Sequence, residues 1–472
     1  MNQSAERTNI ALVFAIVAVA TIGGLLFGYD SGAVNGTQPG LTAAFNLDAA
    51  GLGFTVGSLL IGCFIGAFFA GTLADSMGRR NVMRLAAVLF LGGALVQGLA
   101  HDHTIFVIAR IFGGMAVGAA SVLSPAYISE VAPANIRGRM TTVQQIMIIA
   151  GLTAAFLVNS YLTGLAGGSS MHKLWADIEA WRWMYLMQAV PAVVFLVALF
   201  LIPESPRYLV AKGRNEQATN VLTSLFGPTA AAAKLAEIKG SFSVDHRPRL
   251  RDVLTPAGGR GFLGIRAIVW VGIMLAVFQQ LVGINVIFYY GTFLWQAVGF
   301  NEVDASRMNS LTALMSIPAC IVALLVIDKI GRRPMLLIGS VGMAITLFTM
   351  VYAFSTGSIS GDKLVLSDSM GKIALIAAVS YAMFFNFSWG PVMWVMLGEM
   401  FPNQIRGSSL AVAGFFQWFA NYLVAQSFPI MLTTIGLAAS YSFYGVCAVI
   451  SFFLVAKFIH ETKGKELEAM EG

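Results

Sequence analysis

Charged residues are scarce in this chain. Only 11% of its 472 residues are Asp, Glu, Lys or Arg, whereas an ordinary soluble domain carries about 25%. Hydrophobic residues make up 57%. This balance excludes a soluble globular protein and identifies an integral membrane protein. The net charge of +6 lies mainly in short loops, so it is not interpreted as a sign of nucleic-acid binding.

Cysteine and histidine are also few, which argues against disulfides, metal sites and catalysis. Cys63, Cys320 and Cys447 all fall within apolar runs, and no disulfide is expected from them. Two histidines flank Asp102 in a short loop, but nothing else in the chain completes a metal or catalytic site. We therefore expect no cofactor, no metal and no enzymatic activity.

Apolar runs fill most of the sequence instead. Runs of about 20 residues, the length of a helix that crosses a bilayer, recur along almost the whole chain. The interval between residues 203 and 260 is polar, carries two short helical patterns and is too small to be an enzyme domain. We predict twelve spans, at 10–34, 51–74, 82–100, 104–129, 139–163, 182–202, 262–297, 305–327, 334–355, 371–400, 406–433 and 438–459.

Positive charges are distributed unevenly between the loops. Lys and Arg gather in alternate loops, such as those that follow Asp75 and Asp328, and the loops between them are nearly bare. Positive loops remain in the cytoplasm, so both termini are expected there. The first apolar run lacks a convincing cleavage site and is interpreted as a retained span. The pattern predicts a multi-pass protein of the plasma membrane of the cell, in contact with the lipid bilayer.

The chain also repeats itself. The segment 74–81 (ADSMGRRN) is echoed at 327–334 (IDKIGRRP), and 127–140 is echoed at 396–410. PESPRYL, from Pro203, is echoed more faintly by HETKGKEL. Three echoes in one order, about 250 to 270 residues apart, indicate a duplicated unit. We predict an all-α fold of two six-helix halves, with the site between them as in alternating-access transporters. The expected divisions are 1–202, the cytoplasmic linker 203–260, 261–459 and the tail 460–472.

Three side-chain amides lie in one apolar stretch, which reads FQQLVGINVIFYY from Phe278. Gln279, Gln280 and Asn285 each donate and accept hydrogen bonds, so they need partners in hydrocarbon. Gly283 lies between them and is expected to loosen the helix, so that the amides converge. Taken alone, the trio fits two readings: hydrogen bonds that join neighbouring helices, or a site for an uncharged, polyhydroxylated ligand.

One acid and one base lie at similar depths in the first half. Asp30 falls in the first span, and Arg110 lies about 9 Å into the fourth at 1.5 Å per residue. Opposite charges in a low dielectric are expected to pair. The pair could be a permanent structural bridge, or Asp30 could exchange a proton as the pair opens and closes. The residues alone leave these two roles level.

Several motifs together resemble the sugar porter family of the major facilitator superfamily, most of all its bacterial proton–sugar symporters. The motifs are the two GRR turns, PESPRYL, QQLVGIN, WGPVMW and the terminal ETKG, spread over nearly the whole chain. The resemblance implies binding of a monosaccharide near the middle of the membrane, mostly by the second half. The sugar-binding residues that it implies are Gln145, Gln279, Gln280, Asn285, Trp394, Gln417, Trp418, Phe27 and Tyr289.

Physical arguments support Trp394 in this role. Gly390 and Pro391 should weaken the helix beside it, because proline removes a backbone donor and clashes with the preceding turn. Tryptophan offers an apolar face to sugar C–H groups while amides bond the hydroxyls. Ordinary packing is the alternative for Trp389, Trp394 and Trp418.

The resemblance also bears on coupling and on substrate. It matches Asp30 and Arg110 to the coupling pair of proton symporters, although some facilitators keep an aspartate there. Ser316 replaces an asparagine common in the family, Asn386 stands where facilitators often have glutamate, and a histidine precedes ETKG. The first of these departures leaves the identity of the sugar open.

Acids and bases recur at the cytoplasmic ends of both halves. Paired helix ends would favour the state closed to the cytoplasm and must part for release, whereas solvated charges of little energy are the alternative for any single residue. The predicted gate consists of Arg79, Glu130, Arg139 and Glu204 in the first half and Arg332, Glu399, Arg406 and Glu461 in the second.

These observations lead to one expected function with two alternatives. We predict a transporter that imports a monosaccharide of the xylose, glucose or galactose class together with protons. The first alternative is a passive uniporter in which Asp30–Arg110 is structural. A remote alternative is a transporter-like sugar receptor, although the chain stops soon after Glu461 and so has no long signalling tail. No nucleic-acid partner and no obligate protein partner is expected.

Overall fold

The structure is a computed structural model that describes residues 9–133, 137–244, 253–255, 261–360, 363–401 and 405–463. The side chains of Arg139 and Arg406, both predicted gate residues, lie outside the described part. Helices account for nearly all of the regular structure, which confirms the predicted all-α membrane fold. Two short antiparallel hairpins, which the sequence did not lead us to expect, are the additions.

The first half contains seven α-helices and one short 3-10 helix. Its helices are α1 (Ile10–Phe45), α2 (Ala49–Met77), α3 (Arg79–Leu99), α4 (His103–Val131), α5 (Arg137–Leu165), the 3-10 helix Trp175–Asp177, α6 (Ala180–Leu186) and α7 (Ala189–Ala198). The linker carries α8 (Pro206–Ala211), α9 (Asn215–Phe226) and α10 (Pro228–Val244). The two predicted helical patterns of the linker thus correspond to α9 and α10.

The second half repeats the plan of the first. It consists of β1 (Gly261–Phe262), β2 (Ile265–Arg266), α11 (Ala267–Leu281), α12 (Ile284–Ala297), α13 (Glu302–Ile330), α14 (Arg332–Ser355), β3 (Ser358–Ser360), β4 (Lys363–Val365), α15 (Asp368–Phe387), α16 (Trp389–Met400), α17 (Arg406–Thr434) and α18 (Gly436–Phe458). Each predicted span coincides with one helix or with two consecutive helices: α6 with α7, α11 with α12, and α15 with α16. Within the described residues, eleven of these twelve spans are long and apolar enough to cross a membrane by length and composition, and α17 is the one outside this set.

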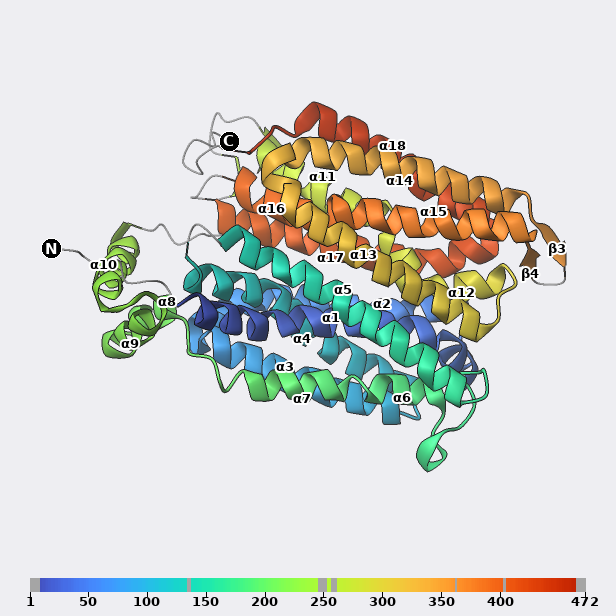
Figure 1. Cartoon of the computed structure of the whole chain (residues 1–472), viewed down its shortest axis with the longest axis horizontal. Helices are drawn as coiled ribbons and strands as arrows, with labels where there is room; N and C mark the ends of the chain where they lie inside the picture. Colours follow the sequence, from blue (N-terminus) through green and yellow to red (C-terminus); the bar gives the residue numbers. More distant parts are fainter. Residues whose placement is uncertain are drawn as a thin grey trace.

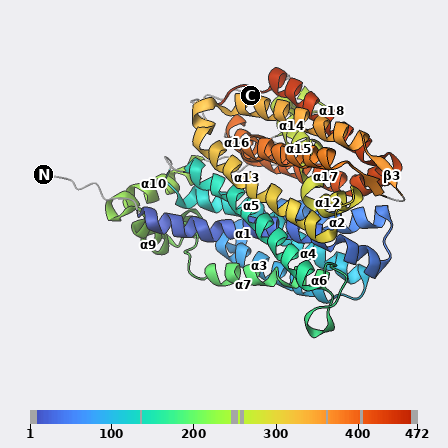
Figure 2. The ribbon, with the colours of Figure 1, turned by 45° about the vertical axis from the view of Figure 1, so that its right-hand side comes forward.

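The two halves lie side by side, and the linker helices stand beyond one end of the bundle (Figures 1 and 2). We call this end the linker end and the opposite end, which carries β3 and β4, the far end. The first described residue, Asn9, donates its backbone N–H to Leu225 of α9 at 2.9 Å, and Lys463 Nζ donates to Lys329 O at 2.6 Å. Both ends of the described chain therefore lie at the linker end.

Helix packing depends on small residues, because lipid provides no hydrophobic force between spans. A Cβ on Gly62 of α2 would lie 2.0 Å from the carbonyl oxygen of Ile111, and one on Gly114 of α4 would lie 1.9 Å from that of Leu59. The backbones of α2 and α4 thus touch directly. Contacts between the halves run mainly along α2 with α17 and α5 with α13.

Capping residues fix where helices begin at the far end. The Asp48 carboxylate accepts the Gly51 N–H at 2.7 Å at the start of α2. Asp102 does the same for two N–H groups of α4, and Asn301 for one of α13. Each side chain satisfies a donor that the first helical turn leaves without a partner.

Candidate functional site

Two helix breaks position the candidate site. Gly283 separates α11 from α12 and adopts φ +87°, a left-handed conformation that glycine tolerates best. The predicted loosening at Gly283 is therefore present as a full break. The second break lies at Ser388, between α15 and α16, just before Gly390 and Pro391. Gly283 packs against Tyr444 of α18 and Ser388 against Gly339 of α14, and both breaks free backbone groups for other partners.

The predicted amides converge into one chain of hydrogen bonds. Gln279 Oε1 accepts from Gln280 Nε2 at 3.1 Å and from Gln417 Nε2 at 3.3 Å. Gln280 Oε1 accepts from Asn285 Nδ2 at 2.5 Å. Gln279 Nε2 donates to the carbonyl oxygen of Trp389 at 3.1 Å, so the chain is tied to the second break. The amides come from α11, α12 and α17, and together they offer a row of neutral donors and acceptors.

Asn421 extends this row and was missing from the sequence-based assignment. Its Oδ1 accepts from Asn285 Nδ2 at 2.9 Å, and its Nδ2 donates to the Tyr289 hydroxyl at 3.1 Å. The signal was present: Asn421 lies four residues after Gln417, on the same face of α17. The predicted residue Tyr289 is thereby joined to the amides.

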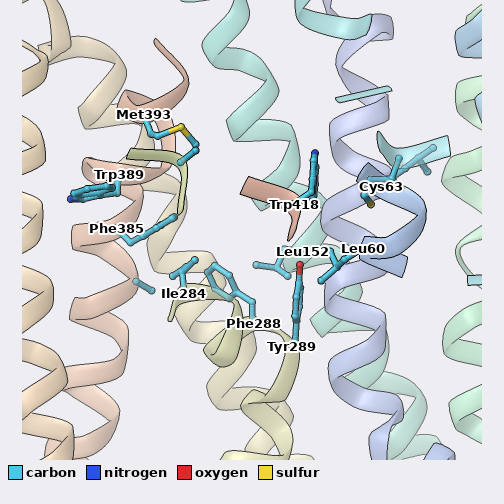
Figure 3. Close-up of a cluster of buried hydrophobic side chains, with 14 of the residues drawn as sticks. Leu60, Cys63, Leu152, Ile284, Phe288, Tyr289, Phe385, Trp389, Met393 and Trp418 are labelled. Carbon is cyan, nitrogen blue, oxygen red and sulfur yellow. The ribbon is translucent and has the colours of Figure 1, made fainter. Parts of the chain in front are cut away.

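The aromatic residues divide into two groups. The rings of Trp418 and Phe27, from opposite halves, meet edge to face with centroids 5.2 Å apart. Figure 3 shows Tyr289 pointing toward Leu60 and Leu152 of the first half. Tyr289 bonds Asn421, and Trp418 directly follows Gln417 on α17, so both aromatic residues lie next to members of the amide row.

The two tryptophans of α16 behave differently. Trp389 is 1% exposed and donates Nε1–H to the carbonyl oxygen of Leu336 at 3.1 Å, which fits ordinary packing. Trp394 is 41% exposed, so it is only partly packed against other residues. Gln145 of α5 reaches the second break from the first half, since its Nε2 lies 3.4 Å from where a Cβ on Gly390 would be.

Two of the three departures from the family pattern, Ser316 and Asn386, form hydrogen bonds to the backbone of their own helices. Ser316 Oγ donates to the carbonyl oxygen of Thr312 at 2.9 Å. Asn386 Nδ2 donates to that of Ala382 at 2.9 Å. Because the Ser316 hydroxyl and the Asn386 amide each donate to their own helix, these donated hydrogen bonds do not extend the amide row.

The predicted pair of Asp30 and Arg110 is formed and buried. Arg110 Nη2 lies 3.5 Å from Asp30 Oδ2, and both side chains are 1% exposed. Gln188 Nε2 donates to Asp30 Oδ1 at 3.2 Å. Arg110 also donates to Gln97 Oε1 at 3.3 Å and to the carbonyl oxygen of Val56 at 3.2 Å. Several partners thus share the desolvated charges, as burial requires.

A polar cluster at the far end joins the halves and was not foreseen. Asn35 of α1 donates Nδ2 to the carbonyl oxygen of Phe288 at 2.7 Å. Its Oδ1 accepts from Thr292 N at 2.8 Å, from Thr292 Oγ1 at 2.5 Å and from Asn309 Nδ2 at 3.1 Å. We call Asn35, Thr292 and Asn309 the far-end latch. Among the described side chains, the hydrogen bonds between helices of the two halves all involve residues of the far-end side.

The charged residues at the linker end pair within each half. Arg79 Nη2 lies 3.1 Å from Glu130 Oε1, and Arg332 Nη2 lies 2.8 Å from Glu399 Oε1. These pairs join α3 to α4 and α14 to α16. The equivalent contacts in the two halves follow the sequence repeat, but they do not by themselves bridge the halves.

Glu204 and Glu461 take equivalent places at two helix starts. Glu204 Oε1 accepts the N–H of Arg80 at 3.2 Å, at the beginning of α3. Glu461 accepts the N–H groups of Arg332 and Arg333 at 3.0 Å each, at the beginning of α14. A carboxylate is favourable at the positive end of a helix. Burial opposes the charge of Glu461, but the backbone N–H of Lys463, at 2.9 Å, and those of Arg332 and Arg333 outweigh it and lower the pKa of Glu461.

The residue after each of these glutamates completes the repeat. Ser205 Oγ donates to Glu130, and Thr462 Oγ1 donates to Glu399 Oε2 at 2.6 Å. The faint sequence echo between PESPRYL and HETKGKEL therefore corresponds to the same set of contacts in both halves.

Comparisons with known proteins agree with this arrangement. A family model described as "Sugar (and other) transporter" matches residues 16–472. The chain is 43% identical to a glucose transport protein of Synechocystis sp. over 99% of this chain and 98% of that one. It is 38% identical to the D-xylose–proton symporter of Escherichia coli K12, with 98% and 96% covered.

Solved structures give the same result. The partially occluded inward-open conformation of the xylose transporter XylE from E. coli superimposes with a TM-score of 0.82 at 35% identity, covering 97% of this chain and 100% of that one. XylE bound to 6-bromo-6-deoxy-D-glucose, a proton:xylose symporter of the major facilitator superfamily, gives 0.80 at 36% identity, with 98% and 99% covered. The chain therefore belongs to the sugar transporter family, and it is a multi-pass membrane transporter and not an enzyme.

Proposed function

We propose that this protein imports a monosaccharide by alternating access, together with a proton. The observation that carries the proposal is the amide row at the two helix breaks, because neutral donors and acceptors suit sugar hydroxyls and no charged group interrupts the row. Gln145, Phe27 and Trp394 complete the proposed site, and Trp394 is 41% exposed. Relatives named as transporters of glucose and xylose support the substrate class.

The proton site in this proposal is Asp30. Its carboxylate is fully buried, yet Arg110, the cation paired with it among the described residues, lies at the long distance of 3.5 Å. A charge at such a depth is costly, so a proton on Asp30 would release Arg110 to its other partners, Gln97 and Val56. The proposed cycle uses this change to switch the packing of α1 against α4.

Orientation and gating belong to the same proposal. The Lys- and Arg-rich turns lie at the linker end, so we place that end in the cytoplasm. The far-end latch then closes the outer side, and the Arg79–Glu130 and Arg332–Glu399 pairs act at the inner gate together with Glu204, Glu461, Arg139 and Arg406. Support for an inward-facing state comes from the likeness to the inward-open conformation of XylE.

A passive uniporter is the second candidate. The relative at 43% identity is named as a glucose transport protein, and that name mentions no proton. In this case Asp30 and Arg110 form a permanent bridge that fixes α1 to α4.

Substitution of Asp30 separates the two candidates. In proteoliposomes, Asp30→Asn should abolish uphill uptake of labelled sugar while exchange between equal pools persists. Gln280→Ala should weaken sugar binding by about tenfold, because a loss of about 1.4 kcal/mol of hydrogen bonding raises the Kd by a factor of about ten. Unchanged uphill uptake in Asp30→Asn would reject the proton role, and normal affinity in Gln280→Ala would reject the site.

A further inference from the structure

Asn421 has both ends of its amide engaged by different elements. Its Oδ1 accepts from Asn285 at 2.9 Å, and its Nδ2 donates to the Tyr289 hydroxyl at 3.1 Å. The side chain is 1% exposed. A carboxamide is a rigid plane with an acceptor at one side and donors at the other. Any rotation that breaks one of the two bonds therefore breaks or bends the other.

Tyr289 carries this contact to the ion pair of the other half. A narrow gap is lined by Asp30, Ser31, Arg110 and Tyr289, with four apolar side chains of α1 and α2. Tyr289 is the one lining residue that comes from the second half. Figure 3 shows its hydroxyl directed toward Leu60, another lining residue. The Tyr289 oxygen accepts from Asn421, so its own proton remains free to donate toward Ser31 and the gap.

Asp30 presents an open acceptor on this side. Oδ1 is bonded to Gln188, whereas Oδ2 has no hydrogen-bond partner among the described residues and only the 3.5 Å approach of Arg110. In the described part of the chain, the titratable groups that face Asp30 are Arg110 of α4, Cys63 of α2, Tyr185 of α6 and Tyr289 of α12. Tyr289 alone among them also touches the amide row.

We propose that Asn421 is a positioning residue that couples sugar binding to the protonation of Asp30 through the Tyr289 hydroxyl. The inference rests on the proposed function, since it takes Asn285 as a sugar ligand and Asp30 as the proton site. A sugar hydroxyl that draws on the Asn285 amide competes with Asn421 for it. Asn421 then turns, the Tyr289 hydroxyl follows, and the polarity of the gap beside Asp30 changes. A hydronium ion gives its proton to the Asp30 carboxylate, and no other covalent bond is made or broken.

Coupling of this kind is measured as a pH dependence of sugar affinity, because two ligands that influence each other do so reciprocally. We would determine the Kd for xylose and glucose by titration of the purified protein between pH 5.5 and pH 8.5, about 1.5 pH units on either side of neutrality. The wild type should change its Kd by roughly tenfold across this range, within the usual strength of such coupling. Asn421→Ala and Tyr289→Phe should each reduce the change to about twofold or less.

Tyr290→Phe provides the matched control. Tyr290 is the next residue of α12 and is buried. Its hydroxyl also contacts α17, because it donates to the carbonyl oxygen of Ala425 at 2.5 Å. That contact stays within the second half and does not reach Asp30. The control should keep the wild-type pH dependence, and Tyr289→Phe keeps the test valid if Asn421→Ala fails to fold.

The outcomes separate this inference from the proposed function. Wild-type pH dependence in both Asn421→Ala and Tyr289→Phe overturns the coupling role, as does an equal loss in Tyr290→Phe. A wild type whose Kd is independent of pH, and matches that of Asp30→Asn throughout, overturns the symport proposal itself. Loss of pH dependence in these two variants, with wild-type pH dependence kept in Tyr290→Phe, supports the inference.

Discussion

The far-end latch predicts how strongly one asparagine holds the outer side closed. Asn35→Ala removes four hydrogen bonds between the halves: one to Phe288, two from Thr292 and one from Asn309. Bonds between membrane helices average about 0.6 kcal/mol, so the loss is about 2.4 kcal/mol. At 1.4 kcal/mol per factor of ten, the equilibrium should shift about 50-fold toward opening at the far end. Asn309 Nδ2 still donates to Thr292 Oγ1 at 3.0 Å after this substitution, so the shift is worked only from the four bonds that Asn35 makes.

Spin labels at exposed far-end positions of each half can follow this opening. Ala44 at the end of α1 and Thr434 at the end of α17 are exposed and lie outside the latch. Pulsed electron resonance should show a longer distance population in Asn35→Ala. The control is Gln426→Ala, which removes a single exposed bond to the carbonyl oxygen of Ala50 and should shift the distances little. An unchanged distance distribution in a well-folded Asn35→Ala protein would refute the latch.

Three further predictions concern the helix ends, the packing and the sugar site. The pKa of Glu461 is lowered in the folded state, so the ionised carboxylate stabilises the fold above the unfolded pKa, and this stabilisation disappears as the pH falls below about 4. The difference in Tm between the wild type and Glu461→Gln should therefore shrink on acidification. A difference in Tm that stays constant with pH would contradict this. Gly62→Ala should destabilise by about 1–3 kcal/mol through overpacking, whereas Gly71→Ala, in the same helix with nothing within 4 Å, should be nearly neutral in thermal unfolding. Trp394→Ala should weaken sugar binding in titration while leaving Tm within a few degrees of the wild type, since its ring is 41% exposed; equal affinity would remove it from the site.

Much of the fold follows from local properties of the sequence. Apolar length alone predicts the spans, and Gly283 marks a break because only a residue without Cβ takes φ +87° at little cost. The second break lies at Ser388 and not at Gly390–Pro391, because the proline ring disturbs the turn before it. The short β3–β4 hairpin left no periodic signal.

The site was predictable where a motif carried it and not where distant residues meet. Gln279, Gln280 and Asn285 are close in sequence, and their convergence follows from the break between them. Asn421 required a choice among the polar residues of α17. The far-end latch joins Asn35 to Asn309 across 274 residues, a contact that no local pattern encodes. The resemblance to a family assigns roles to residues within its motifs. The place of Asn421 in the amide row and the far-end latch depend instead on how the helices pack.

The most direct test of the account is accumulation of labelled xylose and glucose in proteoliposomes, with and without an inward proton gradient. The account predicts that one of these sugars rises above its outside concentration, that a protonophore abolishes the rise, and that Asp30→Asn exchanges sugar without accumulating it. Equilibration that ignores the gradient would contradict the account and leave Asp30 and Arg110 as a structural pair in a uniporter.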